Sequence, residues 1–357
     1  MNDARERLSA SAARLFEDCD RKGEQNDWDA DLWEDLERAN LTLISVPEEF
    51  GGAGGALGDA AAVLRLAGRY AIPVPLAETG FLAGWVLSAS GLPMPNRPLT
   101  VAPVHAGERI DVRRERGGWT LSGCARRVPA ARIAAHLVVI GNADDKVVAS
   151  VGADACEISP GENLASEARD DIVLDGVRLS EAEVVPAGRG VDEEALRLRG
   201  ALARSVMMAG ALERILELSV SYAGERHQFG RPIGKFQAIQ QQLATLAGEV
   251  AAAGAAAEGA VVAAESCETL ADAAFEIAAA KVRVGEAAGA AAAIAHQVHG
   301  AIGFTERHPL HHSTRRLWAW RDEFGTESEW AAQLGDVVIK GGPEALWPAL
   351  TNSSTTD

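Results

Sequence analysis

The stretch "ERHQFGRPIGKFQAIQ" (residues 225–240) interrupts a chain that is rich in Ala and Leu on both sides of it. Helical periodicity runs up to about residue 224 and resumes at residue 237, so the stretch joins two long helices. A plain connection needs only a Gly and a helix cap. This one also carries a cation, an aromatic ring and an amide at Arg226, Phe229 and Gln237.

These residue types suit a phosphate-bearing, planar ligand. An Arg guanidinium grips phosphate through two parallel hydrogen bonds, and an adjacent ring can stack on a heterocycle. Gln237 stands at the start of the next helix, where backbone N–H groups favour anions. From the residues alone, two interpretations stay open. One is a nucleotide clamp, and the other is a helical hairpin in which Arg226 is solvated and Gly230 caps the helix.

Working outward from this stretch, the sequence predicts three domains and a tail. Residues 1–95 show helical periodicity broken by loops. Residues 96–188 carry short β-branched runs at near-regular spacing, which is typical of a small antiparallel β domain. Residues 189–349 return to long periodic segments near 191–224, 237–266, 269–299, 310–322 and from 327, which predict a C-terminal four-helix bundle. The polar residues 350–357 predict a disordered tail. The predicted fold class is α+β, mainly α.

Composition excludes several classes of function. The 357 residues carry a net charge of −17, which argues against nucleic acid or an anionic membrane as a partner. The four cysteines lack metal spacing and fit free thiols in a reducing cytoplasm. The N-terminus has no apolar signal core, so a cytoplasmic location is expected. Charged residues and glycines interrupt the Ala-rich runs 250–264 and 284–295, which are shorter than a membrane span.

A second stretch, "HQVHGAIGFTERHPLHHSTRRLWAWRDEFGTESEW" (residues 296–330), follows a predicted helix. Gln297, Gly300 and Ala301 come where a flat ligand can lie against exposed backbone. His296 and His299 share a helical face, which raises the alternative of a metal site. No Cys, Asp or Glu completes a usual ligand spacing, so no metal is expected and polar packing at the helix end is favoured.

Together the two stretches resemble motifs of the acyl-CoA dehydrogenase family of flavoproteins. "ERHQFGRPIGKFQAIQQQLA" is similar to that family's bundle motif, and "QVHGAIGFTERHPLHHSTRRLWAWRDEFGT" to its C-terminal signature. "LISVPEEFGGAGG" resembles a loop of its helical N-terminal domain. The resemblance covers nearly the whole chain and implies the same order of domains: helical, β, and four-helix bundle.

The resemblance implies an FAD cofactor, an acyl-CoA substrate and α,β-dehydrogenation, in which a carboxylate takes the α-proton and the β-hydrogen leaves as hydride. It further implies a homo- or hetero-oligomer (dimer or tetramer) and an electron-transfer acceptor protein. Carried over by position, Arg226, Phe229 and Gln237 hold FAD across a subunit interface. The resemblance also implies dinucleotide contacts from Gln297, Gly300 and Ala301, with Thr326 near the diphosphate.

The catalytic base is where the chain departs from the family pattern. The family usually places Glu directly before a Gly-Thr pair, and here that position is Phe324. Glu323 is one residue earlier, which turns its side chain by about 100° on a helix. Some family members place the base on the first bundle helix, but the matching region around Gly200 offers Arg199 and Arg204 instead. Glu323 is therefore the candidate base, with an acidic residue on a solvated turn as the alternative.

Two hypotheses follow for the function. In the first, the chain is a self-sufficient FAD-dependent acyl-CoA dehydrogenase that uses Glu323. In the second, it is a non-catalytic subunit of a heteromeric acyl-CoA dehydrogenase and completes a partner's FAD site. The β domain adds to the second hypothesis, because "LTVAPVHAGERI" and "CARRVPAA" replace the segments with which the family usually holds the flavin ring.

Overall fold

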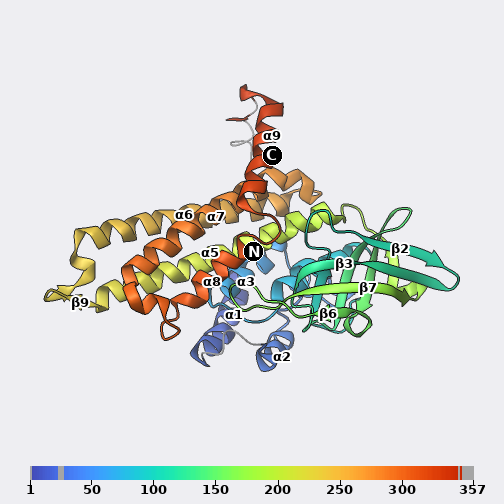
Figure 1. Ribbon diagram of the computed structural model, residues 1–357, viewed down its shortest axis with the longest axis horizontal. Helices are drawn as coiled ribbons and strands as arrows, with labels where there is room; N and C mark the ends of the chain where they lie inside the picture. Colours follow the sequence, from blue (N-terminus) through green and yellow to red (C-terminus); the bar gives the residue numbers. More distant parts are fainter. Residues whose placement is uncertain (1, 23–27, 345, 348–357) are drawn as a thin grey trace. The chain divides into compact units, whose positions relative to one another are not determined.

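The computed structural model describes residues 2–22, 28–344 and 346–347, and its chain divides into two units (Figure 1). Unit 1 comprises Met1–Leu64 and Pro73–Ala203, and unit 2 comprises Arg65–Ile72 and Arg204–Asp357. The three predicted domains, with boundaries at residues 95 and 188, are a finer division and stay a prediction. The predicted tail, residues 350–357, lies outside the described residues.

Unit 1 opens with helical elements that are interrupted by a glycine-rich loop. They are α1 (Asn2–Lys22), α2 (Ala30–Arg38), the 3-10 turn η1 (Glu48–Phe50), the start of α3 (Leu57–Arg69), the π-helix η2 (Ala77–Gly84) and α4 (Trp85–Ala89). Asp29 caps α2 by accepting a hydrogen bond from the Leu32 amide at 2.9 Å. In the loop, a Cβ on Gly52 would lie 2.1 Å from the Val46 carbonyl oxygen, so only glycine fits there.

The remainder of unit 1 is a sheet that lies within the predicted β region, followed by the first turns of α5. Its strands are β1 (Leu99–Ala102), β2 (Ile110–Glu115), β3 (Gly118–Pro129), β4 (His136–Asn142), β5 (Lys146–Gly152), β6 (Glu157–Ser159), β7 (Arg169–Leu179) and β8 (Val184–Pro186). They are ordered β6-β7-β3-β2-β4-β5-β8. The central residues of β4 and β5 are buried and, apart from Ser150, apolar, which explains their runs of Val, Ile and Leu.

The sheet is mixed rather than fully antiparallel. Most neighbouring strands are antiparallel, as predicted, but β1 pairs with β4 in parallel over four residues, and β2 meets β4 in parallel at one residue pair. The antiparallel prediction is therefore wrong for β1 and for the β2–β4 contact. Regular spacing of short strands cannot show which strand enters the sheet beside a non-consecutive neighbour.

Unit 2 contains most of α5 (Glu193–Glu225) and the helices that follow it. These are α6 (Gln237–Ser266), α7 (Ala274–His299), α8 (Leu310–Trp320) and α9 (Glu327–Gly341), with short 3-10 turns η5 (Ile233–Lys235), η6 (Leu270–Ala273) and η7 (Gly300–Phe304). The predicted helices agree with these bounds to within a few residues, except that 270–273 is a 3-10 turn. A capping box between Thr269 and Asp272 starts that turn.

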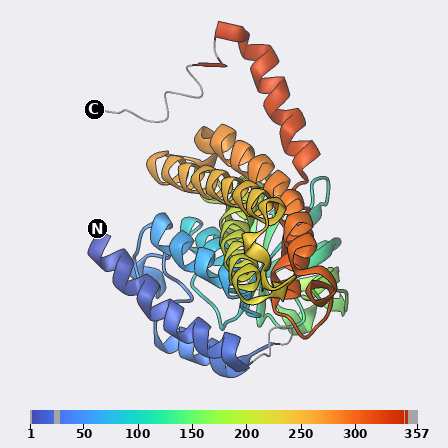
Figure 2. The same cartoon turned by 90° about the vertical axis from the view of Figure 1, so that its left-hand side faces the viewer.

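Small residues let the helices of unit 2 approach closely. A Cβ on Gly68 of α3 would lie 2.0 Å from the Met207 carbonyl oxygen, and one on Gly210 of α5 would lie 1.8 Å from the Arg65 carbonyl oxygen. The buried residues of α6 and α7 include many Ala, and the two helices run alongside each other (Figures 1 and 2). The Ala-rich composition thus produces tight helix packing.

Two helices have unusual surfaces. By length and composition, α6 is the one helix in the described part of the chain that could cross a membrane, although one side of it packs on α7. Beyond its start, α9 points away from the other helices of unit 2 (Figure 2). Trp330 is the buried residue of α9, while Val337 and Ile339 are 52% and 79% exposed. An exposed apolar helix of this kind marks an interaction surface.

Candidate functional site

The quoted stretch forms a tight β-hairpin at the end of α5. Strand β9 (His227–Gln228) pairs with β10 (Arg231–Pro232) in antiparallel fashion, and Phe229 and Gly230 form the tip. Both tip residues have positive φ, 51° and 80°, as a two-residue type I′ turn requires. A positive φ is unfavourable for an aromatic residue, and such strain is often retained at functional positions. The turn therefore holds Phe229 at the tip.

The hairpin presents its cations and rings to solvent. Phe229 is 92% exposed, and Arg226 is also exposed. The Phe229 ring meets the Phe236 ring edge-on at 6.1 Å, and the Arg231 guanidinium lies 4.2 Å from the centre of the Phe236 ring. An aromatic side chain this exposed contributes nothing to the core of its own unit, so its position favours a contact outside the chain.

Helix α6 begins directly beside these side chains. Phe236 is its N-cap residue and supplies no side-chain hydrogen bond to the helix start. Gln237, the first helical residue, is exposed. A 30-residue helix with no side-chain cap offers backbone N–H groups and the positive end of its dipole to an anion. This helix start is suited to a phosphate group.

The end of α7 lies next to the last turns of α5. Tyr222 stacks on His299 with ring centres 4.6 Å apart, which brings the two helix ends together. Gln297 on α7 is exposed, and so are the next residues after the helix, Gly300, with φ of 63°, and Ala301. The structure thus places these residues at the same end of the helices as the hairpin (Figure 1).

The residues at this end of unit 2 fit the dinucleotide half of FAD. They provide an exposed guanidinium for phosphate, an exposed ring for stacking, an uncapped helix start and accessible backbone at glycine. No residue of the hairpin has to leave a buried position in order to reach a ligand.

Thr326 does not join this group within one chain. It caps α9, where its hydroxyl accepts from the Glu329 amide at 3.3 Å and donates to the Glu329 carboxylate at 3.1 Å. The next residue, Glu327, lies beside Gly285 of α7. Gly285 is 14 residues before the end of α7, or roughly 21 Å along the helix axis. Thr326 therefore lies well away from the hairpin along the axis of α7.

The loop "RDEFGT" is closed by aromatic side chains. Phe324, at the position where the family's base would stand, is 3% exposed and has a φ of 55°. The Trp330 indole N–H donates to the Phe324 carbonyl at 3.1 Å. A buried phenyl ring thus fills the space that a base would need.

Glu323 is not a solvated acidic residue, which corrects that alternative. It is 9% exposed, and its carboxylate accepts from Arg204 Nε at 2.7 Å. Arg204 is itself 1% exposed, and its guanidinium lies 5.6 Å from the centre of the Phe324 ring. A general base must present a carboxylate oxygen to its substrate. The Glu323 carboxylate is instead directed toward a buried cation on α5.

Lys281 completes the buried charges around this loop. It is fully buried on α7 and donates from Nζ to the carbonyl oxygens of Arg321 and Gly325, at 2.5 and 2.9 Å. Burial lowers the pKa of Lys281 to about 8, while the Glu323 and Glu327 carboxylates oppose that change. Arg204, Lys281 and the Trp330 ring therefore hold the loop in place through contacts on its buried side.

The base position on α5 also holds no carboxylate. Arg199 is 6% exposed, and its neighbours in the sequence from 195 to 205 carry no Asp or Glu. The carboxylates at the helix start are paired, since Glu193 binds Lys146 and Glu194 binds Arg197. Neither position expected for the base thus presents a carboxylate.

The imidazole rings of the histidines near the end of α7 pack against other aromatic rings. His296 stacks on Phe304 at 4.4 Å, and His299 meets His308 at 4.5 Å. Burial is the main cause that lowers the pKa of these three histidines. Among the residues that the structure describes, no three His, Cys, Asp or Glu side chains form a metal-binding group.

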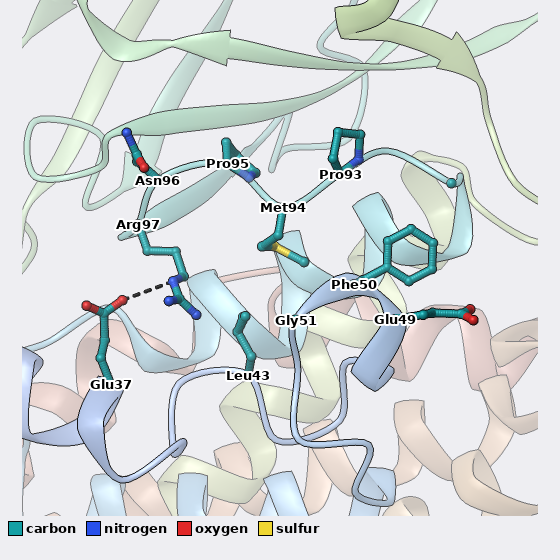
Figure 3. A pocket seen from close by; sticks show the side chains of 11 residues that line it. Glu37, Leu43, Glu49, Phe50, Gly51, Pro93, Met94, Pro95, Asn96 and Arg97 are labelled. Carbon is teal, nitrogen blue, oxygen red and sulfur yellow. Dashed lines mark ion pairs between the residues drawn. The ribbon is translucent and has the colours of Figure 1, made fainter.

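Unit 1 contains a cavity of about 770 Å³ between the loop after α2 and the segment 91–97 (Figure 3). Met94 and Leu43 line it, and at its edge Arg97 forms an ion pair with Glu37 at 2.9 Å. The charge of Arg97 is therefore already neutralised. No motif in the sequence points to a ligand in this cavity.

Sequence reasoning missed the buried charges rather than the exposed ones. Arg204 was noted only because it is not a carboxylate, and Lys281 was not noted at all. The signal for Lys281 was present, because a Lys that directly follows the apolar run "IAAA" must either reach solvent or find buried acceptors. Its partners are carbonyl groups at the end of another helix, which sequence spacing cannot show.

Comparison with known proteins identifies the family of this chain. Residues 2–92 match the N-terminal domain of acyl-CoA dehydrogenases, and residues 188–328 match the C-terminal domain. The chain is 30% identical over 320 residues to acyl-CoA dehydrogenase IpdE2 from Mycolicibacterium smegmatis, which covers 87% of this chain and 91% of that protein.

Solved structures give the same fold. The ChsE4-ChsE5 complex from Mycobacterium tuberculosis matches with a TM-score of 0.86 at 24% identity, covering 96% of this chain and 99% of the other. The Tcur3481-Tcur3483 steroid ACAD matches with a TM-score of 0.83 at 26% identity, covering 95% and 99%. The predicted fold class is confirmed. This chain belongs to the acyl-CoA dehydrogenase family, whose members are FAD-dependent oxidoreductases acting on CH–CH bonds.

Proposed function

We propose that this chain is the FAD-clamping subunit of a heteromeric acyl-CoA dehydrogenase and that its partner subunit supplies the catalytic base. The observation that carries the proposal is the Arg204–Glu323 ion pair behind Phe324. Dehydrogenation requires a carboxylate that can take the substrate's α-proton. The candidate carboxylate of this chain is held by a buried guanidinium, and a phenyl ring occupies the usual position.

The hairpin supports the proposed role of this chain in binding FAD. Arg226 and Phe229 are exposed, and Gln237 starts a helix that no side chain caps. In the proposed assembly these three residues hold the pyrophosphate and adenine of an FAD whose ring lies in the partner. Gln297, Gly300 and Ala301 contact the same dinucleotide. The chemistry that FAD supplies when bound is acceptance of the substrate's β-hydride.

The exposed face of α9 supports an assembly of at least two chains. Val337 and Ile339 leave apolar surface open to solvent, and burial of such surface is the usual driving force for association. Closed symmetry, as in a dimer or tetramer, is the common solution. The separation of Thr326 from the hairpin along α7 also suits an FAD site to which two chains contribute.

The remaining parts of the proposal follow from the family. The substrate is an acyl-CoA thioester, from fatty acid or sterol side-chain metabolism, and a separate electron-transfer protein reoxidises the flavin. The net charge of −17 suits a cytoplasmic enzyme with no nucleic acid or membrane partner. Glu323 acts in this scheme as a structural residue, and the self-sufficient enzyme is the alternative.

Co-expression tests the proposal. The chain is purified alone and together with a paralogous acyl-CoA dehydrogenase chain, and flavin absorbance and acyl-CoA oxidation with an artificial electron acceptor are measured. The chain alone is expected to retain little FAD and to oxidise no acyl-CoA, whereas the mixed assembly does both. A chain that by itself holds one FAD per subunit and oxidises acyl-CoA would refute the heteromeric proposal.

A further inference from the structure

Arg199 lies in an apolar enclosure within unit 1. Its guanidinium carbon is 4.5 Å from the centre of the Phe81 ring and 4.8 Å from that of the Trp85 ring. Its Nε donates to the Phe81 carbonyl at 2.5 Å. Phe81 belongs to the π-helix η2, all eight residues of which are buried, and π-helical turns occur often at functional sites.

The positive charge of Arg199 has no counter-charge in the described part of the chain. Ion pairs there include Arg204, five residues later on α5, but none includes Arg199. Burial lowers the pKa of Arg199 to about 9, and no neighbouring charge contributes to that change. A buried charge is strongly unfavourable unless an opposite charge accompanies it. The arrangement therefore calls for an anion from outside these residues.

The two terminal nitrogens of Arg199 keep their hydrogen-bonding capacity for such an anion. Within the described residues, neither of them takes part in a hydrogen bond, because the one bond of this side chain uses Nε. They are also absent from the polar atoms that are both unpartnered and fully enclosed. Each therefore keeps contact with space that a water-sized group can enter, although the residue as a whole is 6% exposed.

The geometry points to a carboxylate as the ligand, and we propose that Arg199 forms a carboxylate-binding site together with Phe81 and Trp85. The free edge of a guanidinium presents two parallel N–H groups that match the two oxygens of a carboxylate. One cation balances one negative charge, whereas a phosphate dianion would remain half uncompensated. The flanking apolar rings lower the local dielectric around the guanidinium, which strengthens such a pair. None of the FAD-clamping residues takes part, so this site is independent of the proposed function.

Acetate is the smallest practical probe of this site. The purified protein, in its native assembly, is unfolded by heat in sodium acetate and in sodium chloride of equal concentration. Acetate should raise the midpoint by about 2 °C or more relative to chloride, because a ligand of the folded state stabilises it by mass action. The shift should vanish in Arg199→Gln and persist in Arg113→Gln, which removes an exposed guanidinium.

Two results would overturn the site: equal midpoints for the wild-type protein in acetate and chloride, or an undiminished acetate shift in Arg199→Gln. If that variant does not fold, Arg199→Lys keeps the charge and loses the two-pronged geometry, and it should retain less than half of the shift. An undiminished shift in Arg199→Lys would also count against the proposal.

The carboxylate can come from a free acid or from the far end of an acyl group. Glutaryl-CoA and pentanoyl-CoA distinguish these sources, because they share a five-carbon chain and differ in the terminal carboxylate. A preference of tenfold or more for glutaryl-CoA, abolished by Arg199→Gln, assigns the carboxylate to the acyl group. Equal binding of the two thioesters, alongside the acetate shift, assigns it to a free acid.

Discussion

The hairpin at residues 226–232 and the loop at residues 321–326 belong to the same unit. They differ in the exposure of their charged and aromatic residues. In the hairpin, Phe229 is 92% exposed and Arg226 faces solvent. In the loop, Phe324 is 3% exposed and Glu323 is bound to a buried Arg204. Both segments hold an aromatic residue at positive φ, so backbone strain alone does not distinguish them.

The difference shows how each segment relates to a ligand. Side chains that bind an external partner have to remain exposed, at a cost in hydrophobic burial. The exposed Arg226 and Phe229 of the hairpin have this property. Side chains that form ion pairs or hydrogen bonds with one another can be buried, as those of the loop are. The predicted cofactor clamp is therefore exposed in this chain, while a buried phenyl ring occupies the predicted position of the base.

Breaking the buried pair should produce the largest effect on stability. Glu323→Gln removes the carboxylate charge that Arg204 Nε binds, and breaking a buried ion pair typically lowers the free energy of unfolding by about 3–5 kcal/mol. The double variant Arg204→Met/Glu323→Gln removes both charges and should recover most of that loss. Urea denaturation of the three proteins measures this, and a loss below about 1 kcal/mol in Glu323→Gln would show that the pair is not structural.

The exposed face of α9 offers the next largest change. Ile339→Asp places a charge in the proposed subunit interface, where central contacts are commonly worth about 2–4 kcal/mol. Light scattering should show dissociation of the assembly. Val173→Asp alters an exposed apolar residue on β7 and should leave the assembly intact. If both variants dissociated the assembly, or neither did, α9 would not be the subunit interface.

Arg226→Ala tests whether the exposed hairpin binds FAD. Removal of a charge-assisted bond to phosphate costs about 1.5–3 kcal/mol, so FAD should bind roughly 10- to 150-fold more weakly. Flavin absorbance after dialysis of the assembly measures retention, with Arg113→Ala as a control of equal charge change at an exposed position. Full occupancy in Arg226→Ala would remove Arg226 from the clamp.

A smaller effect is expected from pH at the histidines. Burial and the neighbouring His311 are the leading causes that lower the pKa of His312 to about 3. The unfolded chain, with an ordinary histidine pKa near 6.5, therefore binds a proton that the folded chain does not. Stability from this group is present above pH 6.5 and is lost as pH falls toward 3.

We expect His312→Gln to reduce the loss of stability between pH 6.5 and 5 by up to about 1 kcal/mol, after allowance for solvent screening. His227→Gln, at an exposed position, should leave the pH dependence as in the wild type. Thermal midpoints across this range measure the difference. Parallel pH profiles for all three proteins would contradict the assignment.

Much of the fold and the exposed part of the site could be predicted from the sequence. Helical periodicity located α5 and α6, and the residues between them are adjacent in the chain, so their proximity follows from local geometry. The contact of Glu323 with Arg204 joins residues 119 positions apart. Its existence depends on how α8 packs against α5, which periodicity does not encode.

The same distinction applies to Lys281 and Arg199. The sequence shows each as a single cation within an apolar segment, but it does not show whether the partner is a carbonyl, a carboxylate or an external anion. Lys281 meets two carbonyl groups across the bundle, and Arg199 meets one carbonyl and two rings. Buried charges are thus conspicuous in a sequence, whereas their partners emerge from tertiary packing.

The most direct test of the central claim is the rate at which acyl-CoA reduces the flavin of the assembled enzyme when Glu323 cannot accept a proton. Stopped-flow absorbance is recorded for the wild-type assembly, for Glu323→Gln and for the stabilised Arg204→Met/Glu323→Gln double variant, each normalised to FAD content. If the base comes from the partner subunit, the rates of the variants remain within about twofold of the wild-type rate. A general base typically contributes about 10²–10⁴-fold. A loss of that size in both folded variants would make Glu323 the base and contradict the proposed division of labour.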